Sequence, residues 1–309
     1  VRFIFPAVVS RVPLENKSDP FSADPFPAPG FLMRTLLLTI AALTAFAANS
    51  LLCRAALGSF AIDPASFTTL RIASGAAFLA IVSALRSERA EGKIRPGLAS
   101  VAALFIYMTG FSFAYTNLGA GTGALILFGA VQLTMFLTAV RSGERPAARE
   151  WIGVSLAALG LVLLVLPGLS APSPLGAALM AAAGVGWGVY SLLGRRGRSA
   201  LVATTRNFLY CVPLALLLSV IMLRSAHVTT RGVVLALASG VAASGLGYVI
   251  WYAALKNLSA TRAATVQLAA PVLAAFGGVL FLDEVMTLRL SGTAVLILGG
   301  IGLAVAART

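Results

Sequence analysis

The sequence has little charge and few of the residues on which catalysis and metal binding depend. Only 11% of its 309 residues are charged, and it holds one histidine and two cysteines. Soluble domains carry about 25% charged residues, so most of this chain is expected to have lipid around it. His227 falls in a connection between apolar runs, whereas Cys53 and Cys211 lie inside such runs, where we expect small core residues. No disulfide, metal site or cofactor is predicted.

Acidic residues are also scarce, and none of the ten lies in the middle of an apolar run. An Asp or Glu within a membrane span is the usual proton relay or cation anchor of a pump, so its absence argues against that coupling. The sequence also lacks a histidine pair, a Gly-x-Ser-x-Gly nucleophile motif and an intramembrane acidic dyad. We therefore do not expect an enzyme.

Long apolar runs are what the sequence does contain, and hydrophobic residues make up 59% of it. A helix of about 20 apolar residues spans the roughly 30 Å of bilayer hydrocarbon. The runs and their short Pro- and Gly-containing connections predict an all-α membrane protein with ten transmembrane helices. The expected helices cover residues 35–56, 65–85, 98–117, 121–140, 151–167, 174–194, 202–223, 232–255, 261–282 and 288–307.

Residues 1–32 differ from the rest, since they hold six of the fourteen prolines and no sustained helical pattern. Pro6 and Arg11 interrupt the only candidate for a signal peptide, so we expect a disordered tail. Met33, followed by Arg34, resembles a natural start.

The net charge is +13, but the basic residues lie between apolar runs, which does not suggest a nucleic-acid-binding surface. Alternate connections hold most of them; the opposite set holds Arg54, Arg71, Arg224, Arg231 and Arg289. Basic loops stay in the cytoplasm, so we expect a multi-pass protein of the inner (plasma) membrane with both termini cytoplasmic.

The two halves repeat each other at a near-constant offset, which indicates an internal repeat. The matched pairs include Phe46 with Trp187, Asn117 with Asn257, Glu144 with Glu284 and Arg149 with Arg289. We expect five helices in residues 33–169 and five in 170–309. An odd number per repeat inverts the second half, a plan that recurs in secondary transporters.

Two segments resemble the EamA-type transporters of the drug/metabolite transporter superfamily: QLAAPVLAAFGGVLFLDE with the Gly-rich helix after it, and SGERPAAREWIGVSLAALGLVLLV. The resemblance covers about residues 35–307. It implies ten helices as two inverted five-helix repeats and the transport of small metabolites, often amino-acid export. The family often has a proline in the fourth helix, but here Pro271 of the second half aligns with Val131.

Polar and aromatic residues recur at helical spacing on several of the expected helices. We predict that these line a substrate-binding cavity: Asn49, Ser50, Tyr107, Phe111, Gln132, Trp187, Tyr190, Tyr248, Trp251 and Gln267. Rings would hold an apolar side chain and dipoles its polar end. The alternative is that the amides bond across helices and that Tyr and Trp anchor helix ends at the interface.

Other residues receive structural interpretations. Arg71 and Arg206 each open the second helix of a half; we favour side chains that extend to lipid headgroups over ones that attract a carboxylate. Glu284 with Arg289, and Glu144 with Arg149, are expected to form loop ion pairs that fix helix turns. Glycines spaced by seven, Gly153 with Gly160 and Gly292 with Gly299, are expected to permit close helix packing.

The sequence thus predicts a transporter, monomeric or homodimeric, that exports small amphipathic metabolites, most of all amino acids and including aromatic ones, by alternating access. An uptake permease or a broad efflux protein for organic compounds is the alternative within transport. A membrane-embedded enzyme or a scaffold is the alternative outside it.

Overall fold

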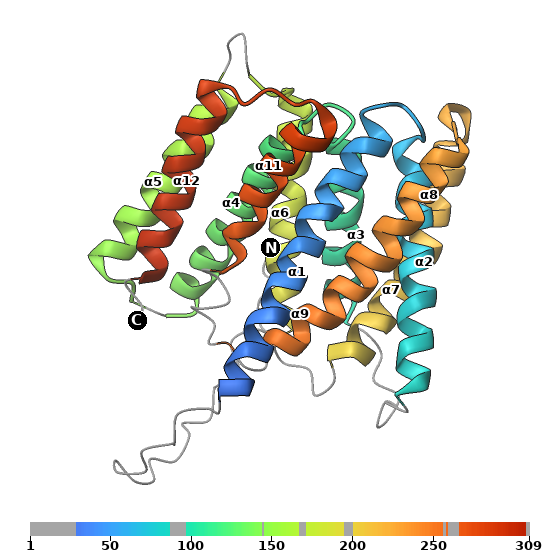
Figure 1. The fold of residues 1–309 in the computed structure, drawn as a ribbon, viewed down its shortest axis with the longest axis horizontal. Coiled ribbons are helices and arrows are strands. Elements are labelled where there is room, and N and C mark those ends of the chain that lie inside the picture. The colour runs from blue at the N-terminus through green and yellow to red at the C-terminus, as the bar shows by residue number, and fades with distance from the viewer. Residues whose placement is uncertain are drawn as a thin grey trace.

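The computed structural model describes residues 29–86, 97–143, 145–166, 171–194, 200–255, 258 and 266–306. In this part of the chain the regular elements are helices, and the strand-like pairing consists of one isolated antiparallel bridge between Ile62 and Val228. The helices lie side by side as a bundle with roughly aligned axes (Figure 1). The all-helical prediction is therefore confirmed for the described residues.

The first half contributes α1 (Pro29–Leu57), α2 (Pro64–Leu85), α3 (Leu98–Ala114), α4 (Ala120–Arg141) and α5 (Ala148–Val165). The second half contributes α6 (Pro174–Gly194), α7 (Ala200–Ile221), α8 (Thr230–Ala238), η3 (Ser239–Leu246), α9 (Gly247–Leu255), α11 (Ala269–Leu282) and α12 (Leu288–Ala306), with a short 3-10 turn, η2 (Leu223–Ser225), before α8. Seven helical stretches are long and apolar enough to cross a membrane, and three shorter apolar helices accompany them within the described residues.

The helix bounds differ from the predicted ones at a few places with local causes. Helix α1 begins at Pro29 rather than at residue 35, and proline suits the first turn of a helix. The helix expected over 232–255 is continuous, but its middle is the π-helix η3. Residues 1–28, Glu144 and residues 261–265 lie outside the described part, so the calls made on them, including the tail, stay predictions.

Three pairs of corresponding helices pack against each other in opposite directions: α2 with α7, α4 with α11 and α5 with α12. Thr69 in the second turn of α2 donates a hydrogen bond to Ala215 near the end of α7, at 2.8 Å. Ala120 at the start of α4 contacts Glu284 just after α11, and Arg289 at the start of α12 donates to Leu166 just after α5. Each corresponding pair is thus antiparallel, as an inverted repeat requires.

The remaining packing follows the same symmetry. Helix α3 packs on α6 as α9 packs on α1, and α4 packs on α6 as α11 packs on α1. Exchanging the two halves therefore gives the same pattern of contacts between these helices. Helices α5 and α12 form a pair at one edge, apart from the elements around α1 and α6 (Figure 1).

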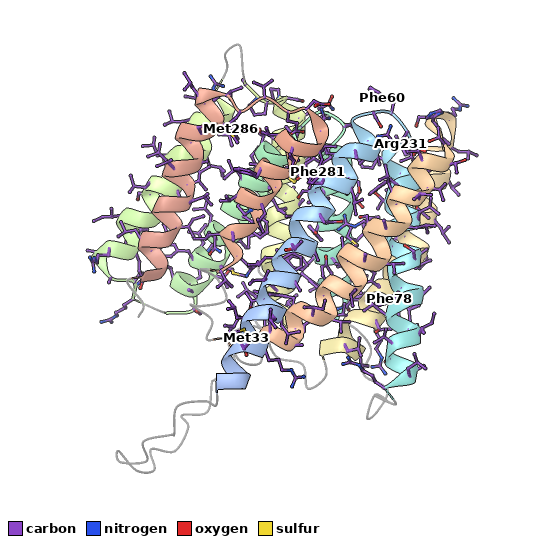
Figure 2. The ribbon with its side chains drawn as sticks, in the orientation of Figure 1. Met33, Phe60, Phe78, Arg231, Phe281 and Met286 are labelled. Atoms are coloured by element: carbon purple, nitrogen blue, oxygen red, sulfur yellow. The ribbon has the colours of Figure 1, made fainter. Side chains whose placement is uncertain are left out.

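The outside of the bundle is apolar. Large hydrophobic side chains project outward, among them Phe281 of α11 and, in connections between helices, Phe60 and Met286 (Figure 2). Phe281 is 71% exposed. Exposed apolar surface on this scale marks contact with another apolar phase, and here it agrees with lipid contact by the helices.

Glycines allow the close approach of α5 and α12. A Cβ atom at Gly153 would meet the backbone of Gly300 and Ala304, and one at Gly160 would meet Ile297. The predicted role of Gly153 and Gly160 is therefore confirmed. For Gly292 and Gly299 it is wrong: among the described residues, nothing lies within 4 Å of a Cβ at either position. The residue beside Gly299, Gly300, faces the neighbouring helix instead.

Candidate functional site

A small cavity lies between the two halves, among side chains from α1, α3, α4, α6, η3 and α9. Its volume is about 20 Å³. The lining residues are Phe46, Asn49, Ser50, Tyr107, Phe111, Leu127, Phe128, Trp187, Ala243 and Tyr248. This volume suits about one water molecule. In this structure the cavity is therefore too small for a metabolite-sized molecule.

Six of the ten predicted site residues line this cavity: Asn49, Ser50, Tyr107, Phe111, Trp187 and Tyr248. Tyr190 and Trp251 lie one ring farther out, with centroids 5.8 Å from Trp187 and 5.7 Å from Phe46 respectively. Gln132 and Gln267 do not line it. The buried Nε2 of Gln132 has no hydrogen-bond partner among the described residues.

Aromatic rings make up one side of the site, with Trp187 at their centre. Its ring centroid lies 4.9 Å from that of Tyr107 and 5.1 Å from that of Tyr248. It also lies 6.1 Å from the ring of Phe46, edge to face. Phe46 and Trp187 occupy matched positions in the two repeats, so this contact joins equivalent points of the two halves at the cavity.

Polar groups on α1, one of them held by η3, make up another side. Asn49 accepts a hydrogen bond at 2.7 Å from the hydroxyl of Ser239, the first residue of η3. Ser50 follows Asn49 in the lining. Buried amides and hydroxyls need partners in an apolar interior. The Asn49–Ser239 bond meets part of that need and connects a first-half helix to a second-half one.

Arg71 is the polar residue that the sequence reading placed wrongly. Its side chain does not extend to lipid headgroups but is 0% exposed in the interior. Its Nε donates to Ser244 at 3.0 Å and its Nη2 to Tyr107 at 3.2 Å, while Nη1 has no hydrogen-bond partner within the described residues. The guanidinium carbon lies 4.9 Å from the ring centre of Phe111, a cation–π contact.

The start of α2 explains this burial. Asp63 caps the helix through the N–H groups of Ala65 and Ser66, and Pro64 follows it. Arg71 therefore lies about 10 Å along the helix at 1.5 Å per residue, which is well inside a span. An arginine there costs about 2.5–3.5 kcal/mol on insertion scales. The Asp-Pro start was the signal in the sequence that could have placed Arg71 inside.

The π-helix η3 brings the second half against α2 at Arg71. A Cβ atom at Gly240 would meet the backbone oxygen of Arg71, so only glycine permits this approach. Ser239 and Ser244, in the same segment, hold Asn49 and Arg71 respectively. Single π-helical turns are often found at functional sites, where they change the direction of side chains.

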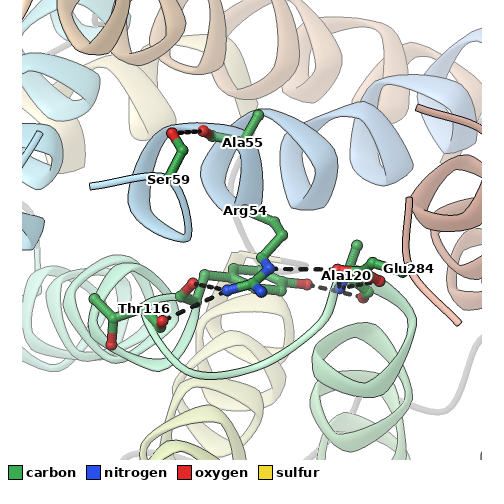
Figure 3. A network of polar contacts seen from close by, with 7 residues as sticks. Arg54, Ala55, Ser59, Thr116, Ala120 and Glu284 are labelled. Atoms are coloured by element: carbon green, nitrogen blue, oxygen red, sulfur yellow. Dashed lines mark hydrogen bonds and ion pairs between the residues drawn. The ribbon is translucent and has the colours of Figure 1, made fainter. Parts of the chain in front are cut away.

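One face of the bundle is closed by contacts between the halves; we call it the Glu284 face. Glu284 lies 3.3 Å from Arg54 of α1 and accepts hydrogen bonds from the N–H of Ala120 at 2.8 and 2.9 Å (Figure 3). Arg54 also donates to the carbonyl of Tyr115 at 3.3 Å. The predicted partner of Glu284, Arg289, instead donates to Leu166.

A second junction closes the same face. The backbone N–H of His227 donates to the carboxylate of Asp63 at 3.0 Å, and the N–H of Asp63 donates to the carbonyl of His227 at 2.8 Å. Thr229 donates to Ala61 through both its N–H and its hydroxyl. The connection between α1 and α2 is thus tied to the one between η2 and α8.

Comparison with known proteins gives the family. The model of the EamA-like transporter family matches residues 33–166 and 174–306. This chain belongs to that family. The two matches fall within the two predicted halves, and membership shows a multi-pass membrane transporter.

Relatives and a solved structure agree with this assignment. An uncharacterized protein of Pseudomonas aeruginosa is 49% identical over 275 residues, which cover 89% of this chain and 96% of the relative. An uncharacterized transporter of Archaeoglobus fulgidus is 27% identical over 249 residues, covering 77% of this chain and 87% of the relative. One crystal structure has a TM-score of 0.62 at 22% identity, covering 87% of this chain and 98% of its own. It supports the fold alone.

Proposed function

We propose that this EamA-family transporter exports amino acids or related small amphipathic metabolites through the cavity around Trp187. The observation that carries the proposal is the cavity itself, which lies between two inverted halves and combines aromatic rings with an amide and hydroxyls. Such a lining suits a molecule with an apolar side chain and a polar end. Binding near the interface of the repeats is the usual arrangement in transporters with inverted repeats.

Alternating access supplies the mechanism that we propose. The cavity holds about one water molecule in this structure, so a substrate requires the two halves to move apart on one side at a time. The contacts at the Glu284 face form one closure. The symmetry that exchanges the two inverted halves would produce an equivalent closure at the opposite face. The ten spans, cytoplasmic termini, inner-membrane location and monomeric or homodimeric state belong to the same proposal.

A flux assay tests the proposal. Proteoliposomes loaded with a mixed pool of radiolabelled amino acids are compared for the unaltered protein, Trp187→Ala and Asn49→Ala. Trp151→Ala is the matched control, because Trp151 of α5 is 48% exposed and does not line the cavity. We expect amino-acid flux that falls about tenfold or more in the cavity variants, since a buried Trp-to-Ala change removes 3–5 kcal/mol of packing.

The outcomes separate the parts of the proposal. Absence of amino-acid flux from the unaltered, folded protein would contradict the substrate class. Flux that Trp187→Ala and Asn49→Ala leave unchanged would contradict the site. The direction of flux in vesicles of known protein orientation distinguishes an exporter from an uptake permease.

A further inference from the structure

The buried guanidinium of Arg71 has no acidic partner in the described part of the chain. It is fully buried, and the groups it contacts are a serine hydroxyl, a tyrosine hydroxyl and two aromatic rings. None of these carries a negative charge at neutral pH. A buried cation is ordinarily paired with an anion. The site as it stands lacks that anion.

The position that an anion paired with Arg71 would occupy lies beside the cavity. Tyr107 and Phe111, over whose rings the guanidinium lies, both line the cavity, and so does Ala243, the residue before Ser244. One guanidinium nitrogen, Nη1, has no hydrogen-bond partner among the described residues, and neither has the hydroxyl of Tyr248 in the lining. Two unused polar groups thus accompany the positive charge.

Within the described part of the chain, the lining contains no acidic side chain. A substrate's ammonium group would therefore find neutral oxygens there, from Asn49, Ser50, Tyr107 and Tyr248, and the faces of aromatic rings, but no negative charge. A carboxylate would find a guanidinium, the group whose planar donors match its two oxygens. The electrostatics of the site favour the acidic end of a metabolite over its basic end.

We propose that Arg71 is the binding residue for the carboxylate of the transported molecule, and that the substrate is an aromatic or large apolar carboxylic acid, with or without an amino group. This inference rests on the proposed transport function and narrows its substrate class. The carboxylate lies against Arg71 when the cavity opens, and the apolar part lies among Trp187, Tyr248 and Phe46. An amine of the same shape without the carboxylate does not bind.

A binding experiment tests this without requiring transport. Purified protein in detergent is titrated with 3-phenylpropanoate and, separately, with 2-phenylethylamine, and the tryptophan fluorescence is recorded. We expect saturable binding of the acid and none of the amine. Arg71→Gln should weaken binding of the acid about tenfold to a hundredfold, because hydrogen bonds to charged groups contribute on that scale. Arg231→Gln, which removes an exposed cation from the first turn of α8, should bind as the unaltered protein does (Figure 2).

Several outcomes would overturn the inference. Equal binding of acid and amine, or no binding of the acid, would contradict it in the unaltered protein, even should Arg71→Gln fail to fold. Unchanged affinity in a folded Arg71→Gln would contradict it directly. Saturable binding of chloride in place of the acid, lost in Arg71→Gln, would assign the charge to an inorganic anion. Binding of the acid with no flux in proteoliposomes would uphold the site and contradict the transport proposal alone.

Discussion

Arg54 of the first half and Glu284 of the second half meet at 3.3 Å, and Glu284 also caps the start of α4 through Ala120. The pair therefore connects α1, α4 and the end of α11 at one point. Of these helices, α1 and α4 also line the cavity. Breaking this contact is expected to favour the form that opens toward that face.

Glu284→Gln tests that expectation, with Asp283→Asn as the matched control. Glutamine keeps an oxygen for Ala120 but loses the charge; a partly exposed ion pair contributes about 1 kcal/mol, or about fivefold in the equilibrium. Asn tolerates the left-handed conformation of Asp283 (φ 54°). With Ser50→Cys as the sole cysteine, we expect a membrane-impermeant maleimide to react several-fold faster in Glu284→Gln. Equal rates in both variants would contradict a closing role.

Ser244→Ala should destabilise the protein by removing the partner of Arg71 Nε. A buried donor left without an acceptor costs about 1–3 kcal/mol. In a double variant with Arg71→Gln, the loss should be smaller than the sum of the two single losses, because the donor is then absent. Thermal unfolding in detergent measures all three variants, with the exposed Ser225→Ala as control. Strict additivity would show that the hydrogen bond contributes nothing.

Gly153→Ala should be destabilising and Gly299→Ala should not, although both glycines lie within the α5–α12 pair. At Gly153 the new methyl group would meet the backbone of α12, an overpacking that costs about 1–3 kcal/mol. At Gly299 the space is open, and helix propensity favours alanine by about 1 kcal/mol. Melting temperatures of the two variants should move in opposite directions. A shift of the same sign and size would contradict the packing described for this pair.

Asp63→Ala should destabilise the protein more than Ser59→Ala. Asp63 caps α2 and also accepts from His227 of the other half, whereas the hydroxyl of Ser59, just after α1, donates to the carbonyl of Ala55 in the last turn of α1. Loss of an N-cap costs about 0.5–2 kcal/mol, and the second acceptor adds to it. Asp63→Asn, which keeps the cap, should fall between the two. Unfolding in detergent at increasing temperature gives the order.

Local patterns in the sequence predicted what depends on composition and period. The length of the apolar runs predicted the helices, and the internal repeat with its odd number of helices predicted that the second half is inverted relative to the first. The stripes at helical spacing placed Asn49 and Trp187 on faces that do meet at the cavity. Which of several stripes face one another is a property of packing, so Gln132 and Gln267 were indistinguishable from lining residues.

Contacts between distant segments were beyond such patterns. Glu284 was matched with Arg289 because the two are near in sequence, whereas its partners, Arg54 and Ala120, come from the other half. The π-helix around Ser244 is too short to leave a hydrophobic periodicity of its own in the sequence. The change in side-chain direction that brings Ser244 to Arg71 could therefore not be predicted. Arg71 was misplaced for a related reason: burial depends on its neighbours as well as on its place in the helix.

The unpaired charge of Arg71 also bears on how the membrane potential acts on this protein. With a carboxylate that has no amino group bound, the site is neutral, and without a substrate it carries one positive charge. Moving one elementary charge through 100 mV changes the free energy by about 2.3 kcal/mol. The step in which the empty protein changes conformation is therefore the one expected to respond to voltage, while the step with such a carboxylate bound proceeds almost independently of it.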